Sequence, residues 1–175
     1  MIKAIETKYK GHRFRSRLEA RWAVFFEAAG IKWIYEKEGF IFNGKSYLPD
    51  FHLPGIGYFE VKGRHDFDDE LMQEFANEIN ETIFVAIEEI PHPENEKGYL
   101  KSFLPSHLQD DDDIKYWGYD DMFLKCDGCG KITIQNEVYN SINGNCCSGS
   151  RELSIDDALQ IAREARFEHG ESPGV

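Results

Sequence analysis

The first regular pattern of apolar residues in the chain predicts a helix over residues 16–30. Apolar side chains recur there at the i, i+4, i+7 and i+8 spacing of one helical face, at Leu18, Trp22, Phe25, Phe26 and Ala29. Ser16 is a favourable N-cap residue, and Gly30 can adopt the left-handed conformation that ends a helix. Glu19 lies one turn before Trp22, so we expect its carboxylate to face protein.

Short extended segments follow this helix and predict a meander of strands. They alternate apolar and polar side chains and cover residues 32–36, 40–42, 47–53 and 58–62. Asn43-Gly44 favours the positive φ angles of a hairpin turn, and residues 54–57 form a tight connection between the last two segments.

A second helix and a buried strand come next. Residues 68–80 place Leu71, Phe75 and Ile79 on one side of a helix, and residues 82–87 form a nearly continuous apolar run, rich in β-branched residues, typical of a buried strand. The predicted order is therefore helix, meander of strands, helix and strand. This order indicates an α/β fold built on a mixed sheet.

Two carboxylates and one amine occupy the polar faces of neighbouring strands. Side chains alternate along a strand, so Asp50 faces away from Phe51, and Glu60 shares a face with Lys62 opposite Val61. Two oxygen ligands close together suit Mg²⁺, which retains several waters and accepts a phosphate oxygen. A nearby ammonium can orient the attacking water and offset developing charge. This combination indicates phosphodiester hydrolysis.

The sequence Pro49-Asp50 followed by Glu60-Val61-Lys62 resembles the motif of the PD-(D/E)XK nuclease superfamily, and Glu19 resembles the glutamate that many members carry on the preceding helix. The resemblance covers about the first 90 residues and is strongest to small members such as very-short-patch repair endonucleases and phage-borne or transposon-associated nucleases. It implies a restriction-endonuclease-like αβββαβ core. It also implies that Asp50, Glu60 and Glu19 hold Mg²⁺ or Mn²⁺, and that Lys62 positions the nucleophilic water for cleavage of DNA.

Each element of this motif also has a simpler interpretation. An acid and a lysine at i and i+2 are common on solvated strands, and Pro-Asp is frequent in loops, so the joint order of the elements carries the hypothesis. The main alternative is a non-catalytic subunit with the nuclease fold, which binds nucleic acid or a protein partner and regulates a DNA-processing or defence complex. RNA in place of DNA is a further alternative.

The net charge of −12 is unfavourable for binding DNA, but the charge is unevenly distributed. Residues 3–32 carry eight basic and three acidic side chains, a local charge of +5. Within this stretch we expect Arg13, Arg15 and Arg17 to contact backbone phosphates. Acidic residues gather at 66–70 and 110–113, where a solvated loop is the simpler interpretation and a protein-docking surface the alternative.

The composition changes after residue 90, where two prolines in three residues indicate a boundary. We expect three parts: a nuclease-like core over residues 1–90, an acidic connecting segment over residues 91–121 that packs on the core, and a zinc-ribbon-like module with a C-terminal helix over residues 122–175. The C-terminal helix is predicted over residues 154–168, with Ser154 as its N-cap.

The four cysteines of the chain lie in this last part and predict a structural zinc site. Cys126 and Cys129 form a CxxCG knuckle, in which glycine relaxes the backbone around the metal. Cys146 and Cys147 are adjacent, so either both bind zinc on a twisted backbone, or one is replaced by a ligand such as His169 or left free. A reduced hairpin without metal is the remaining alternative.

The chain contains no apolar run of membrane-spanning length and no charged-then-apolar leader. We therefore expect a soluble protein of the cytoplasm of a bacterial or phage-infected cell, with DNA as its partner and no membrane. A small nuclease with one site that cuts both strands implies a dimer or two successive nicks, and the sequence does not distinguish them.

Overall fold

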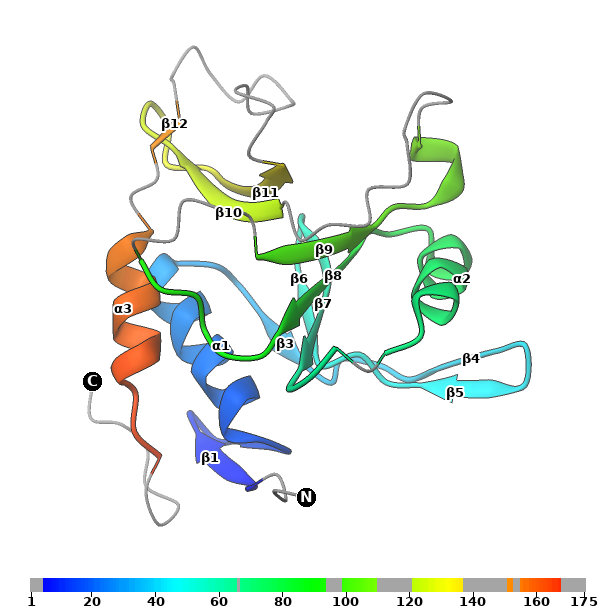
Figure 1. Ribbon diagram of the computed structural model, residues 1–175, viewed down its shortest axis with the longest axis horizontal. Coiled ribbons are helices and arrows are strands. Elements are labelled where there is room, and N and C mark those ends of the chain that lie inside the picture. Colours follow the sequence, from blue (N-terminus) through cyan, green and yellow to red (C-terminus); the bar gives the residue numbers. More distant parts are fainter. Residues whose placement is uncertain are drawn as a thin grey trace.

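The computed structural model describes residues 5–65, 67–93, 99–109, 121–136, 151–152 and 155–167. These residues form a mixed α+β fold with three α-helices and a large mixed sheet (Figure 1). The helices are α1 (Arg17–Ala29), α2 (Asp69–Ile79) and α3 (Asp156–Glu164). The sheet has eight strands in the order β11-β10-β9-β8-β7-β6-β3, and β12 pairs with β10.

The centre of the sheet follows the order of elements that the apolar pattern predicts. The strands β3 (Ile34–Tyr35), β6 (Phe51–Leu53) and β7 (Gly57–Lys62) pair antiparallel, with α1 before them. The helix α2 then leads to β8 (Ile83–Ile87), which pairs parallel with β7. The chain continues into β9 (Leu100–Phe103), antiparallel to β8.

The strand predicted over residues 47–53 is wrong in its extent, because the chain divides it between two sheets. β4 (Phe40–Phe42) and β5 (Lys45–Tyr47) form a separate hairpin, and β6 begins only at Phe51. Pro49 has no backbone N–H and lies in the gap between β5 and β6, where the chain changes partners. The predicted hairpin turn is confirmed, since Asn43 and Gly44 both have positive φ angles.

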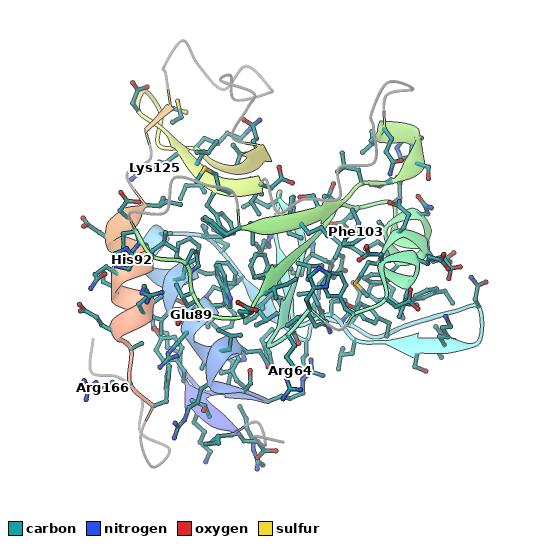
Figure 2. The ribbon with its side chains drawn as sticks, viewed as in Figure 1. Arg64, Glu89, His92, Phe103, Lys125 and Arg166 are labelled. Atoms are coloured by element: carbon teal, nitrogen blue, oxygen red, sulfur yellow. The ribbon has the colours of Figure 1, made fainter. Side chains whose placement is uncertain are left out.

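Two apolar clusters cover the two faces of the central sheet, as Figure 2 shows with side chains drawn. On one face, α1 packs on the strands and α3 packs on α1, and the predicted stripe of α1 supplies Trp22, Phe25 and Phe26, which contact Phe59 or Phe123. On the other face, α2 and the β4–β5 hairpin pack around Phe75. A buried aromatic residue contributes roughly 2–3 kcal/mol, so these clusters hold the sheet rigidly between its helices.

One glycine fixes the start of β7. Gly57 has a φ of +145°, and a Cβ atom at this position would lie 2.4 Å from the carbonyl oxygen of Thr82. Only glycine allows this close approach, and the Tyr58 amide donates to that same oxygen at 2.9 Å. The approach sets the register of β7 against β8.

The sheet continues beyond residue 90. β10 (Asp121–Cys126) pairs with β9, with β11 (Ile132–Asn136) and with β12 (Arg151–Glu152), and α3 packs against α1. The sheet therefore runs through the boundaries expected near residues 90 and 121, and the division into three parts stays a prediction. The acidic run at 110–113 lies outside the described residues.

The C-terminal helix is shorter than predicted. α3 spans Asp156–Glu164, and Ile155 occupies its N-cap position without a side-chain hydrogen bond. The expected cap Ser154 and the expected last residue Glu168 lie outside the described residues. No helix in the described part of the chain is both long and apolar enough to span a bilayer.

Candidate active site

The register between β6 and β7 places the two predicted metal-binding carboxylates opposite each other. Phe51 pairs with Phe59, so Asp50, directly before β6, lies across from Glu60. A hydrogen bond also joins the two residues, because the Asp50 amide donates to Glu60 Oε2 at 3.2 Å, and the neighbouring Val61 amide donates to Asp50 Oδ2 at 2.8 Å. Both side chains are almost fully buried, at 3% exposure each.

Lys62 supplies the amine expected beside these carboxylates. Its Nζ lies 2.5 Å from Glu60 Oε1, and its side chain is 28% exposed. Alternation along β7 puts Lys62 and Glu60 on the same face of the strand, and β7 is hydrogen-bonded on both sides. The ammonium is therefore held between the buried carboxylate and solvent.

Glu19 reaches the same cluster from the first turn of α1. Ser16 caps the helix by accepting from the Glu19 amide at 3.1 Å, and Glu19 Oε1 in turn accepts from Ser16 Oγ at 2.7 Å. Glu19 Oε2 accepts from the Tyr35 hydroxyl at 2.7 Å and from the Arg15 amide at 3.1 Å. The carboxylate is 6% exposed, as expected from its place on the helix.

Arg15 is part of this cluster, which the sequence does not reveal. Its guanidinium pairs with Asp50 Oδ1 through Nη2 and with Glu36 Oε1 through Nε, the latter at 3.0 Å. Burial lowers the pKa of Arg15, but the charge of Asp50 and the hydrogen bond with Tyr35 outweigh it, so the pKa lies above its usual value. The contact joins residues 35 positions apart and depends on the tertiary fold.

The pKa of Asp50 is shifted by its burial and by the negative charges around it. Burial is the main cause that raises the pKa of Asp50 well above its usual value, and the charges of Glu60 and Glu19 raise it further. The Val61 amide and Arg15 oppose this shift without cancelling it. Burial and the charge of Glu60 likewise raise the pKa of the Tyr47 hydroxyl. A divalent cation would relieve this repulsion.

The donor set fits a magnesium-like ion with few protein ligands. Mg²⁺ is commonly held by one or two carboxylates and retains several waters, and Asp50 and Glu60 supply two carboxylates on residues that lie opposite each other. Within the described ranges, no three His, Cys, Asp or Glu side chains are arranged as ligands of one ion. All six carboxylate oxygens of Asp50, Glu60 and Glu19 accept hydrogen bonds or pair with cations.

The other two arginines expected to contact phosphate lie apart from this cluster. Arg13 is paired with Glu6 on the surface, and its side chain is 71% exposed. Arg17 begins α1 and is partly buried, and its Nε has no hydrogen-bond partner among the described residues. Their roles at phosphates stay predictions.

The structure describes half of the predicted zinc site. Cys126 ends β10 and is buried, whereas Cys129 is exposed in the turn before β11. The Cys126 amide donates to the Lys131 carbonyl and the Gly130 amide donates to the Cys126 carbonyl, both at 2.9 Å, and Gly130 has a φ of 71°. Cys146, Cys147 and His169 lie outside the described residues.

We predict that Asp50→Asn stabilises the protein at neutral pH in the presence of a chelator. The folded-state pKa of Asp50 is raised, so the unfolded chain releases this proton first and folding loses free energy as the pH rises above about 4. The variant should therefore be more stable at pH 7, and the difference should vanish below about pH 4. Thermal denaturation across this range measures the effect, with the exposed Glu78→Gln as control. A wild type that is more stable at pH 7 contradicts the prediction.

Comparison with known proteins identifies no relative. No family model matches the chain, and no curated protein or solved structure matches it either. Function must therefore be inferred from the side chains of the cluster.

Proposed function

We propose that the chain is a divalent-metal-dependent endonuclease that hydrolyses phosphodiester bonds of DNA. The observation that carries the proposal is that the buried residues Asp50 and Glu60 lie opposite each other, joined by the Asp50 amide, with the Lys62 ammonium on Glu60. The order α1, β3, β6, β7, α2 and β8 also agrees with the core that the PD-(D/E)XK motif implies.

Each residue of the cluster has a role in this proposal. Asp50 and Glu60 would hold Mg²⁺ or Mn²⁺, with Glu19 as a third ligand or as a group that adjusts their charge. A bound divalent ion supplies a Lewis acid and lowers the pKa of a bound water. Lys62, which pairs with Glu60, would orient the attacking water and offset the negative charge that develops on the phosphate.

The charge distribution supports a polyanionic substrate near this cluster. The segment over residues 3–32 carries a local charge of +5 in a chain of net charge −12, and it contains Arg15 and Glu19. Because attraction to phosphates comes from this stretch, binding should weaken strongly with added salt.

A second candidate is the non-catalytic subunit with the same fold. The observation in its favour is that Arg15 and Lys62 already form ion pairs with Asp50 and Glu60. Such an arrangement can be a stable ion-pair network without any chemistry, because structural networks also shift pKa values.

A nicking assay distinguishes the two candidates. With supercoiled plasmid and Mg²⁺ or Mn²⁺, we expect wild type to nick, and Asp50→Ala and Lys62→Ala to lose activity by about a hundredfold or more. Glu78→Ala and Lys45→Ala, which remove exposed charges away from the cluster, should retain activity. Equal nicking by all variants contradicts the enzyme proposal, as does absence of cleavage on every DNA and RNA offered.

We further predict that Arg15→Ala binds Mn²⁺ more tightly than wild type. The guanidinium pairs with the Asp50 oxygen that a metal ion would use, so its removal eliminates a competitor. We expect a gain of about tenfold, which corresponds to about 1.4 kcal/mol. Calorimetry of Mn²⁺ binding measures this without substrate, with Arg13→Ala as control because Arg13 pairs with Glu6 on the surface. Unchanged or weaker binding by Arg15→Ala contradicts it.

We also propose a structural zinc ion at Cys126 and Cys129 with Cys146 and Cys147. The hydrogen bonds of the turn resemble those of a zinc knuckle, and Arg151 of β12, four residues after Cys147, pairs with Cys126 in the sheet. Metal analysis of protein purified without chelator should give about one zinc per chain. Cys126→Ser should lower the zinc content and the thermal stability. Protein without stoichiometric zinc contradicts this assignment.

A further inference from the structure

A groove of about 660 Å³ includes His12, whose ring is near that of Tyr35, and the Tyr35 hydroxyl contacts Glu19 of the carboxylate cluster. It is formed by the hairpin of β1 (Thr7–Tyr9) and β2 (His12–Phe14), the end of α1 and the start of β3. The side chains that give it its chemical character are Lys10, His12, Glu27, Lys32, Trp33 and Ile34.

Trp33 is held in a fixed orientation in this groove. Its indole packs against Phe14 and Phe51, with ring centroids 6.0 and 5.9 Å away, and its Nε1 donates to Glu27 Oε1 at 3.1 Å. The exposed His12 lies 5.0 Å from the indole. Two aromatic rings therefore line the groove, and the packing around Trp33 limits the conformational entropy lost on binding.

Two lysines add positive charge beside these rings. Lys10 pairs with Glu27 at 2.8 Å, but both side chains are exposed, and solvent weakens such a surface pair. Lys32 is exposed and has no acidic partner in the described part of the chain. A phosphate can therefore bind these ammonium groups with little competition.

The groove and the carboxylates are close enough to bind the same nucleic-acid strand. The His12 ring lies 6.3 Å from the Tyr35 ring, and the Tyr35 hydroxyl donates to Glu19 at 2.7 Å. A nucleic acid with one phosphate at Asp50 and Glu60 can thus place a nucleotide further along the same strand in the groove. Aromatic rings beside cations are the combination with which proteins bind unpaired bases and their phosphates.

We propose that this groove binds one unpaired nucleotide of the substrate, with the base stacked on Trp33 and the phosphate held by Lys32 and Lys10. The proposal rests on the proposed nuclease function and specifies its substrate as a nucleic acid with a single-stranded segment. A base within a duplex presents its edges and not its face, so it must leave the stack to contact the indole.

Binding measured in chelator tests the groove separately from catalysis. Labelled oligothymidylate and a blunt duplex of equal length are compared by fluorescence anisotropy. We expect wild type to prefer oligothymidylate, Trp33→Ala to weaken that binding about tenfold, and Trp33→Phe to retain most of it. Lys32→Glu should weaken binding as well, whereas Lys45→Glu, the same charge change on the distant β4–β5 hairpin, should not.

Each outcome decides between the alternatives. Wild-type affinity in both Trp33→Ala and Lys32→Glu, no measurable binding of oligothymidylate, or an equal loss for the blunt duplex overturns the groove. Because Lys32 is exposed, its variant keeps the test valid if Trp33→Ala fails to fold. Specific binding without any nicking in Mg²⁺ supports the groove and contradicts the nuclease proposal. Nicking by wild type, with binding of oligothymidylate unchanged in the Trp33 and Lys32 variants, supports the nuclease proposal and contradicts the groove.

Discussion

The antiparallel register of β6 and β7 is the constraint on which the rest of the cluster depends. It places Asp50 and Glu60 opposite each other in a buried position, where two carboxylates repel and lose their hydration. Such a pair persists only if neighbouring groups compensate it. The Val61 amide, Arg15 and Lys62 do so, and each lies on or beside a strand or helix held by the aromatic core.

Burying these carboxylates together lowers the free energy of unfolding relative to a fold with apolar side chains at the same positions. Replacing buried ion pairs by apolar residues of similar volume is often neutral or stabilising, so structure alone gives little reason to bury Asp50, Glu60 and Glu19 together. A raised pKa from burial and like charges is frequent at functional sites because a substrate or metal ion can relieve it. Their burial and the sequence motif therefore indicate the same three residues as a functional site.

The sequence predicts the helix and strands that carry the carboxylate cluster better than it predicts the contacts between their side chains. The stripe on α1 and the alternation around Asp50, Glu60 and Lys62 depend on local periodicity, which is why the burial of Trp22 and the shared face of β7 follow from the pattern. The break between β5 and β6, the ion pair of Arg15 with Asp50 and the pairing of β9 with β8 depend on which segments meet in space. No periodicity in one stretch of sequence encodes such meetings.

The helix α1 connects the two proposed parts of the substrate site. Glu19 in its first turn belongs to the carboxylate cluster, and Glu27 near its end orients Trp33 and pairs with Lys10 in the groove. The eight residue steps from Glu19 to Glu27 rise about 12 Å along a rigid helix. Because the core fixes α1 on the sheet, this spacing cannot adapt to the substrate. A strand that occupies both parts must match this fixed distance, which is easier for a flexible single strand than for a stiff duplex.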